Sequence, residues 1–458
     1  MKKFIGDKKF YKLLLIILIP IVLQQLLTQF VNLLDNIMIG VVGNDQMTGV
    51  SLANQILFVY NLCVFGCLGG ASIFATQYFG ANNKKGYQES FRYKWLVGII
   101  IFTVFTLVTI FFNEPLLKAF INSNEGDFSN PDIVLAEGKK YLLIMLIGNL
   151  FFLLKEIYAS SLREMKETLF PMICGVIAIL INLILNYLLI YGKLGFPELG
   201  VSGAAIATVI SRVVEFLIIV IYVLIKKNKF DYLVGVFKRL LPKASSIKHF
   251  TPKTLLLLSN EFFWSLGLTV IVSCYSQRGL DAMASLNIAN TVCNLFITLG
   301  ISMGNATGII IGNLLGKGEI KEAKEASYRI LGFAVVSSLF FSLLMILSSY
   351  FIPNIYDTSE SIKAVAKVLI IIGAVFVPVQ AFNTCSYFML RAGGKVFLTI
   401  LFDSLYVWII RLPFAFILAY FTNLSVVWLY FLINMTDALK IFMGYYLVDK
   451  GVWLKQLN

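Results

Sequence analysis

Long apolar stretches recur along the whole chain, and short polar segments separate them. A helix of about 20 apolar residues crosses the core of a bilayer. The pattern therefore predicts an all-α integral membrane protein with twelve transmembrane helices. The expected spans lie near residues 12–38, 50–78, 92–112, 138–160, 170–191, 201–225, 254–276, 284–314, 328–351, 362–389, 395–420 and 424–448.

Part of this pattern occurs twice. When residues 43–85 are shifted forward by 236 positions without a gap, eight of the 43 positions are identical, including Gly43 with Gly279 and Asp45 with Asp281. A duplicated bundle of membrane helices is typical of a transporter that works between its two halves. We therefore predict two pseudo-symmetric six-helix lobes, residues 1–225 and 254–458, joined by a cytoplasmic linker at 226–253.

The linker mixes apolar residues with Lys238, Arg239 and Lys243. This mixture suits an amphipathic helix on the membrane surface, and a plain basic linker is the alternative. The linker also contains His249, which is the only histidine of the chain. Histidine-based metal or acid–base chemistry inside the membrane is therefore excluded, and we expect a protein that is not an enzyme.

The composition agrees with a membrane protein. Hydrophobic residues make up 59% and charged residues 14% of the 458 residues, with a mean hydropathy of +0.83. Soluble domains have about 45–50% apolar and about 25% charged residues. The net charge of +13 gathers in alternate loops, to one of which Lys94 is assigned, and by the positive-inside rule this pattern places both termini in the cytoplasm. We expect a multi-pass protein of the inner (plasma) membrane and no nucleic-acid partner.

A stripe of glycines follows the expected eighth span at every fourth residue. Glycine at this spacing lets another helix backbone approach closely, and such packing holds helices together in lipid. A smooth seam for sliding during a conformational change is the alternative. The stripe consists of Gly300, Gly304, Gly308, Gly312 and Gly316.

Asp35 is the most informative ionisable residue, because charged groups at membrane depth are rare and usually functional. It follows Gln25, Thr28 and Asn32 at spacings of three and four, so all four share one helix face. The apolar run from Ile37 follows directly, which places Asp35 before the helix end. The alternative is a surface acid near the outer mouth.

Possible partners for Asp35 lie on the next helices. Asn182 and Asn186 are four residues apart on the fifth span, and the sixth span contains Thr208. Amide, hydroxyl and carboxylate oxygens around one carboxylate suit a hard monovalent cation such as Na⁺. The alternative for the asparagines is hydrogen bonding between helices, worth about 0.6 kcal/mol per pair.

The second half has its own polar residues within spans. Glu261 lies near the start of the seventh span, and Asp403 and Arg411 share a face of the eleventh, where each forms an ion pair with the other or with another helix. Amides on several spans are expected to line a central cavity for amphipathic molecules, or alternatively to bond helices together. The cavity candidates are Gln25, Asn32, Asn54, Asn287, Asn290, Asn294 and Gln380.

Short motifs at the ends of spans resemble those of a known protein family. They are Leu162-Arg163, Pro171-Met172, Asn182 to Asn186-Tyr187, the block Gly195–Arg212, Leu390-Arg391-Ala392-Gly393-Gly394-Lys395, and the glycine turns Gly80-Ala81-Asn82 and Gly316-Lys317-Gly318. In these motifs, and over essentially its full length, the chain resembles the multidrug and toxic compound extrusion (MATE) family.

The resemblance implies a secondary active antiporter that exports cationic or amphipathic drugs in exchange for Na⁺ or H⁺ by alternating access. It implies an ion site at Asp35, Asn182 and Asn186, and Glu261 matches an acid of the sodium-coupled branch. Some members carry an aspartate at the position of Asn186. The tenth-span acid of the sodium-coupled branch has no counterpart, because Gln380 and Asn383 stand there.

Rival functions remain. The nearest is a flippase for lipid-linked oligosaccharides, which would need a more cationic cavity than Arg212, Arg411, Lys155 and Lys440 supply. A membrane-embedded enzyme or a channel fits the dispersed acids and the duplication less well. We expect no cofactor besides the coupling ion, which is Na⁺ or H⁺, and a monomer in the lipid bilayer that binds small amphipathic or cationic substrates.

Overall fold

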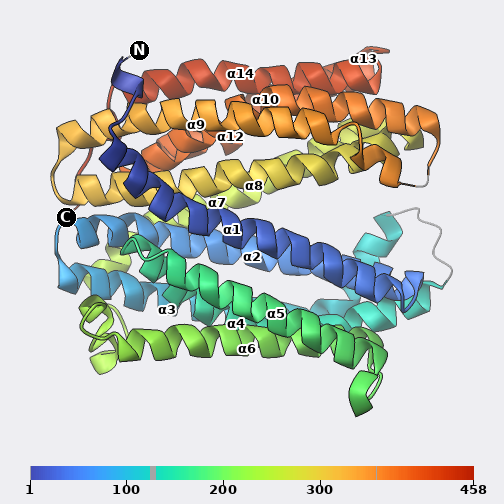
Figure 1. Ribbon diagram of the computed structural model, residues 1–458, viewed down its shortest axis with the longest axis horizontal. Coiled ribbons are helices and arrows are strands. Elements are labelled where there is room, and N and C mark those ends of the chain that lie inside the picture. The colour runs from blue at the N-terminus through green and yellow to red at the C-terminus, as the bar shows by residue number, and fades with distance from the viewer. Residues whose placement is uncertain (1, 124–129, 357, 458) are drawn as a thin grey trace. The chain divides into compact units, whose positions relative to one another are not determined.

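The computed structural model of the chain describes residues 2–123, 130–356 and 358–457. Over these residues the chain is helical and forms no strand (Figure 1). Twelve stretches among them are long and apolar enough to cross a membrane. The prediction of an all-α protein with twelve transmembrane helices is therefore confirmed.

Many of the helices begin earlier or end later than the expected apolar stretches, because flanking residues continue the helical geometry at one end or at both. The spans of the first half are α1 (Lys8–Gly40), α2 (Asn44–Gly80), α3 (Lys84–Ser123), α4 (Pro131–Glu164), α5 (Leu169–Tyr191) and α6 (Gly200–Ile225). Those of the second half are α7 (Ala244–Ser276), α8 (Leu280–Gly316), α9 (Ile320–Ser348), α10 (Glu360–Ala392), the composite α11 (Val396–Phe402), α12 (Ser404–Tyr406), η6 (Val407–Arg411) and α13 (Leu412–Phe421), and α14 (Val426–Asp449).

Local sequence sets several helix ends. At the start of α4, the Asn130 side chain accepts from the backbone N–H groups of Asp132 and Ile133, and Pro131 fills the first helical position. At the end of α5, Gly192 adopts a φ of +62°, the left-handed conformation that terminates helices and that glycine adopts without strain.

The eleventh span is broken, although the sequence predicted one helix over 395–420. Asp403 leaves helical geometry with φ −111° and ψ −83°, and η6 that follows is a π-helix. The side-chain oxygen of Asn260 accepts from the Ser404 N–H at 3.4 Å, so the break is supported by another helix. Irregular backbone at membrane depth is tolerated where protein groups satisfy it, and π-helical turns are frequent at functional sites.

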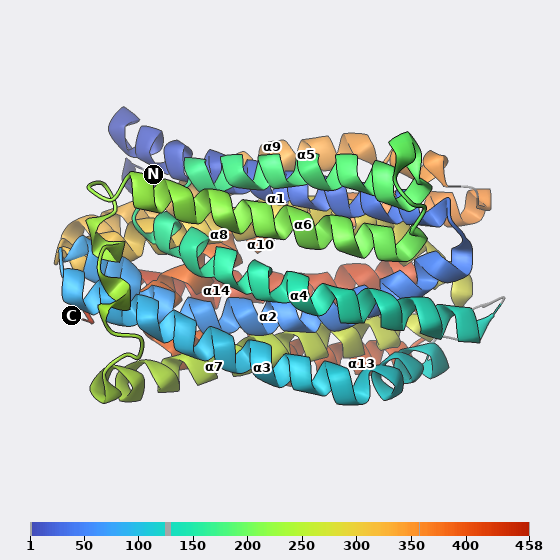
Figure 2. The ribbon, with the colours of Figure 1, turned by 90° about the horizontal axis from the view of Figure 1, so that it is seen from below.

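The described chain divides into two compact units. Unit 1 comprises Met1–Val22, Thr76–Asn83 and Leu255–Asn458, and unit 2 comprises Leu23–Ala75 and Lys84–Thr254. The first turns of α1 belong to unit 1 because their apolar side chains are buried there beside residues of α8, α9, α10 and α14. In unit 2, α4 packs against α3 and α6, and α5 packs against α6 (Figure 2). The lobes predicted from the sequence stay a prediction about which segments move together.

Gln77 in the last turn of α2 is buried among unit 1 residues. Its amide nitrogen donates to the carbonyl oxygens of Ala392 and Lys455 at 2.8 and 3.2 Å, and its oxygen accepts from the Leu457 N–H at 2.7 Å. Trp453, which precedes Lys455 in the same C-terminal tail, is fully buried. The C-terminal tail is therefore part of the packed structure of unit 1.

The segment between α6 and α7 does not form the surface helix that we considered. It contains only two short 3₁₀ turns, η3 (Asp231–Leu233) and η4 (Val236–Lys238), and α7 begins already at Ala244. Gly235 between the turns has a φ of +74°, which interrupts a helix. The segment is attached to α3, whose Arg92 donates to the carbonyl oxygens of Val236 and Arg239.

The glycine stripe of α8 allows close helix contact, as its spacing predicted, at three of its five positions. A Cβ atom on Gly316 would lie 1.9 Å from the carbonyl oxygen of Gln77, and one on Gly312 would lie 2.4 Å from the Thr76 hydroxyl. A Cβ on Gly304 would lie 2.4 Å from the Phe388 ring. At Gly300 the nearest atom is 4.0 Å away. The stripe therefore packs closely against two neighbours, α10 and the end of α2.

We expect Gly316→Ala to destabilise the protein and Gly300→Ala to leave its stability unchanged. The alanine methyl at 316 meets backbone atoms, which cannot rotate away, and such overpacking costs about 1–3 kcal/mol. The midpoint of thermal unfolding in detergent measures the difference. Equal midpoints for the two variants would contradict the close approach of α8 to α2.

Candidate functional site

Asp35 contacts the fifth span directly. It lies in the second half of α1, is partly buried, and its Oδ1 accepts a hydrogen bond from Nδ2 of Asn186 at 2.5 Å. A bond to a carboxylate is shorter and stronger than one between neutral groups. The expectation that Asp35 faces Asn186 rather than lipid therefore agrees with the geometry.

A chain of side chains continues from this pair. Nδ2 of Asn186 also donates to Oδ1 of Asn182 at 3.2 Å, and Nδ2 of Asn182 donates to the Thr208 hydroxyl at 3.2 Å. Asn182 and Asn186 are buried, one turn apart on α5. Three helices thus supply the four residues that the sequence grouped: α1, α5 and α6.

The oxygen of the Asn186 side chain is buried and has no hydrogen-bond partner among the described residues. A buried polar oxygen without a partner is costly and usually has a functional explanation. No basic side chain lies within ion-pair distance of Asp35 in the described part of the chain. A buried carboxylate beside amide and hydroxyl oxygens provides the hard oxygen ligands that suit Na⁺, and the carboxylate can also take up a proton.

The predicted cavity residues are distributed over four helices, because the partly buried Gln380 lies on α10. Gln25 on α1 and Asn290 on α8 are partly buried, whereas Asn54 on α2 and Asn287 and Asn294 on α8 are exposed. Asn32 also lies on α1, but its side chain falls outside the described part of the structure. The cavity role of these residues stays a prediction.

Glu261 has its own surroundings in unit 1. Its Oε1 accepts from the Tyr387 hydroxyl at 3.1 Å and lies 4.0 Å from Nη1 of Arg391. The amide of the preceding Asn260 donates to Tyr387 at 3.3 Å and to Asp403 at 3.1 Å. Glu261 is thus a buried acid with a basic neighbour, which distinguishes it from Asp35.

Asp403 and Arg411 do not pair with each other. Arg411 Nη1 lies 2.8 Å from Asp437, and Asp403 lies 3.5 Å from Lys440, so each pairs with α14. The break at Asp403 and the π-helical turn that ends at Arg411 change the face that each presents. Of the two pairings considered from the sequence, the one with another helix is the observed one.

Asp437 is a buried acid that the sequence reasoning missed. It accepts from the Gln380 amide at 3.4 Å, and its carbonyl oxygen accepts from Asn383 at 2.9 Å. An acid from α14 therefore stands beside the two amides of α10. Its position within an apolar span was a signal that could have found it.

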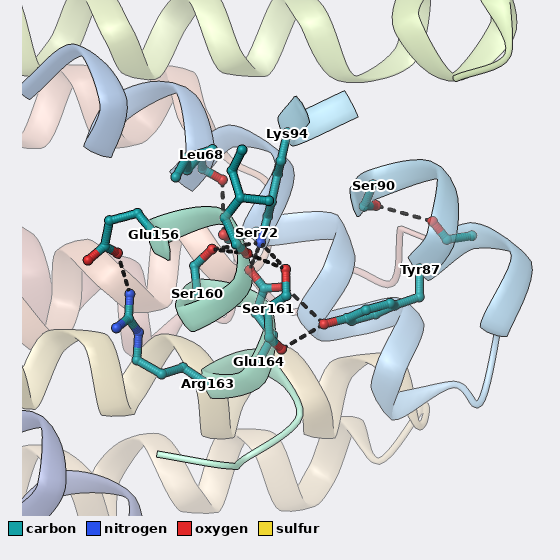
Figure 3. Close-up of polar contacts among 12 residues, drawn as sticks. Leu68, Ser72, Tyr87, Ser90, Lys94, Glu156, Ser160, Ser161, Arg163 and Glu164 are labelled. Atoms are coloured by element: carbon teal, nitrogen blue, oxygen red, sulfur yellow. Dashed lines mark hydrogen bonds and ion pairs between the residues drawn. The ribbon is translucent and has the colours of Figure 1, made fainter. Parts of the chain in front are cut away.

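A second buried charge cluster joins α3 to α4 in unit 2 (Figure 3). The Lys94 side chain is 0% exposed, and its Nζ lies 2.5 Å from Glu164, 3.1 Å from Ser160 and 3.2 Å from Ser161. The hydroxyl of Tyr87 donates to the Ser161 carbonyl oxygen at 2.7 Å and lies 3.4 Å from Glu164. Lys94 is therefore a fully enclosed cation rather than a loop residue.

Most other acids within the spans have a basic partner within 4.0 Å, in contrast to Asp35. Lys155 pairs with Glu156 at 2.9 Å and Glu215 at 3.4 Å, and Arg163 pairs with Glu156 at 2.8 Å. A carboxylate that is already neutralised by an ion pair attracts a further cation weakly. Asp35 is therefore the described acid best placed to exchange a cation.

Comparison with known proteins gives a family match in both halves of the chain. The family model MatE matches residues 20–188 and 256–421. The two matches begin 236 residues apart, which is the shift at which the sequence repeats.

The curated relatives carry related descriptions. "Probable multidrug resistance protein NorM" of Thermotoga maritima is 25% identical over 89% of this chain and 85% of its own length. The protein of the same description in Haemophilus ducreyi is 27% identical over 88% of this chain and 85% of its own. "Probable multidrug resistance protein YoeA" of Bacillus subtilis is 24% identical over 96% and 93%.

Solved structures share the fold. One, described as the "outward-facing conformation of a multidrug resistance MATE family transporter of the MOP superfamily", superposes with a TM-score of 0.85 at 18% identity and covers 98% of both chains. A transporter of the same superfamily from Pyrococcus furiosus has a TM-score of 0.83 at 19% identity, again over 98% of each chain. At such identities the likeness establishes the architecture.

Proposed function

Because the chain belongs to the MatE family, and is therefore a multi-pass membrane transporter and not an enzyme, we propose that it is a secondary active antiporter that exports cationic or amphipathic compounds in exchange for Na⁺ or H⁺. The bacterial relatives with which it aligns over most of its length are described as multidrug resistance proteins, which supports multidrug efflux at the plasma membrane. The positive-inside pattern supports cytoplasmic termini.

The observation that carries the ion coupling is the contact between Asp35 and Asn186. The Asn186 N–H₂ group faces the Asp35 carboxylate at 2.5 Å and stabilises its negative charge. Rotation of the Asn186 amide would turn its unpartnered oxygen toward Asp35. The site would then offer carboxylate and amide oxygens to Na⁺, while protonation of Asp35 would serve H⁺ coupling at the same place.

Export then follows from linkage between ion and substrate. Coupling requires only that the ion and the substrate favour different conformations of the protein. Uptake of a cation by Asp35 changes the hydrogen bonding between α1, α5 and α6, which are the helices joined by this network. We propose that this change biases alternating access toward substrate release on the outside.

The charge distribution supports efflux over the flippase alternative. A pyrophosphate carrier needs several free cations in its cavity, but three of the four candidates have carboxylate partners. Lys155 pairs with Glu156, Arg411 with Asp437 and Lys440 with Asp403. Among the described residues, Arg212 is left without an acid within 4.0 Å, and one guanidinium is too little for a pyrophosphate.

Reconstituted liposomes test the proposal. Ethidium efflux is followed under an imposed Na⁺ gradient and, separately, under an imposed pH gradient, with protein-free liposomes as the control. We expect at least one gradient to drive ethidium against its own concentration difference. Transport that depends on neither gradient would overturn the antiport mechanism. The gradient that drives efflux identifies the coupling ion.

A further inference from the structure

Arg212 is a basic residue near the middle of a span that lacks a carboxylate partner. It lies in α6 (Gly200–Ile225), and no described acid comes within 4.0 Å of its guanidinium, unlike Lys155, Arg411 and Lys440. A charge at this depth is costly in lipid, so such residues face the protein interior or a water-filled cavity and are usually functional. Arg212 is therefore a candidate binding site for an anion.

The surroundings hold the guanidinium in a defined place in unit 2. Its Nη1 donates to Oδ1 of Asn149 at 3.0 Å, and its Cζ lies 5.1 Å from the centre of the Phe152 ring. The backbone carbonyl of Asn149 accepts from the buried Tyr60 hydroxyl at 3.0 Å. Residues of α2, α4 and α6 thus orient Arg212 without neutralising it.

Asn149 adds an unused donor. It is 1% exposed, and its amide nitrogen is buried without a hydrogen-bond partner among the described residues. The orientation of this amide is set by chemistry, because arginine has only donors and the atom that faces it must be the oxygen. Arg212 and Asn149 therefore leave N–H groups that need an acceptor, and no described side chain supplies one.

We propose that Arg212 and Asn149 form a subsite for a monoanionic group, namely the carboxylate of a substrate that also carries a cationic or aromatic part. A guanidinium fork matches a carboxylate in two parallel hydrogen bonds, and one amide N–H₂ adds a third donor. Thr208, which belongs to the Asp35 network, lies one turn away on the same face of α6. The inference rests on the proposed function in that substrates enter the interior of unit 2.

The test compares one dye with and without its carboxylate. Tetramethylrhodamine carries the carboxylate, and tetramethylrhodamine methyl ester is the same dye with that charge removed. Binding to the purified full-length protein is measured by fluorescence polarisation. Arg212→Gln should weaken binding of the carboxylate dye about tenfold or more, the loss expected for a hydrogen-bonded charge, and should not weaken binding of the ester.

Two further variants keep the result interpretable. Arg212→Lys retains the charge but loses the planar fork, so it should fall between the parent and Arg212→Gln for the carboxylate dye. Arg329→Gln makes the same chemical change at the exposed pair with Glu325 and should alter neither dye. If Arg212→Gln cannot be purified, the parent and Arg212→Lys still decide the matter.

Three outcomes overturn the subsite: no binding of the carboxylate dye by the parent, an equal loss of both dyes in the Arg212 variants, or no change in either dye. The proposed function is judged separately by ethidium export in liposomes. A protein that exports ethidium but shows no Arg212 effect remains an efflux antiporter without this subsite. A protein that binds the carboxylate dye through Arg212 but exports nothing keeps the subsite and loses the antiport mechanism.

Discussion

Replacing Asp35 with asparagine is expected to abolish cation-driven export while leaving the fold intact. Asparagine has the same shape and keeps an oxygen that can accept from Asn186 Nδ2, which lies 2.5 Å from the carboxylate in the parent. It cannot bind a proton or neutralise Na⁺, so the differential affinity that couples ion to substrate is lost. Coupling of this kind is worth a factor on the order of 100. We therefore expect ethidium efflux under an imposed gradient to fall to the rate of protein-free liposomes.

The matched control is Asp281→Asn, which makes the same change at an exposed acid in the first turn of α8. It should retain the parent rate. Gel filtration in detergent confirms that both variants are folded. If Asp35→Asn exported ethidium as fast as the parent, the ion would have to bind elsewhere, and the assignment of Asp35 would fail.

Removal of Lys94 is expected to give the largest loss of stability. The Lys94→Met variant leaves the Glu164 carboxylate, 4% exposed, without its cation, and breaking one side of a buried ion pair costs about 3–5 kcal/mol. The double variant Lys94→Met/Glu164→Met removes both charges and should recover most of the loss, since apolar replacements of a buried pair are often neutral or stabilising. The midpoint of thermal unfolding in detergent measures both effects.

Lys118→Met is the control for this series, because its pair with Glu114 is exposed and screened by water. Its midpoint should equal that of the parent. A double variant no more stable than Lys94→Met would show that the individual side chains, including the contacts of Lys94 with Ser160 and Ser161, matter more than the charge balance.

The twelve spans and the Asp35 group could be predicted because the first follow from apolar length and the second from the spacing of polar residues. Apolar length alone defines a membrane helix, and a spacing of four places Asn182 and Asn186 on one face, where they do lie together. Asp35 could be predicted as a site residue because an isolated acid in an apolar helix needs hydrogen-bond or ion-pair partners. In these cases each residue could be judged from its own helix.

What the sequence did not reveal depends on the register between helices. From the sequence, Lys94 was assigned to a loop because a basic residue near the end of a span resembles a topology signal. In the structure its side chain is buried, where it pairs with Glu164 on α4. Asp437 went unnoticed because its partners, Arg411 and Gln380, lie on two other spans. The break occurs at Asp403, where neither proline nor glycine predicts it. It is stabilised by Asn260 on α7, which is far away in the sequence.

The division of the chain into unit 1 and unit 2 has a consequence for genetic dissection. A gene cut between α6 and α7 would separate Met1–Val22 and Thr76–Asn83 from the rest of unit 1. The later fragment would then be translated without Leu14 and Ile17, which are fully buried in its core, and without Gln77, which holds its tail. The later fragment would therefore lack part of its own packed core, and we expect activity to return only when both fragments are made in the same cell.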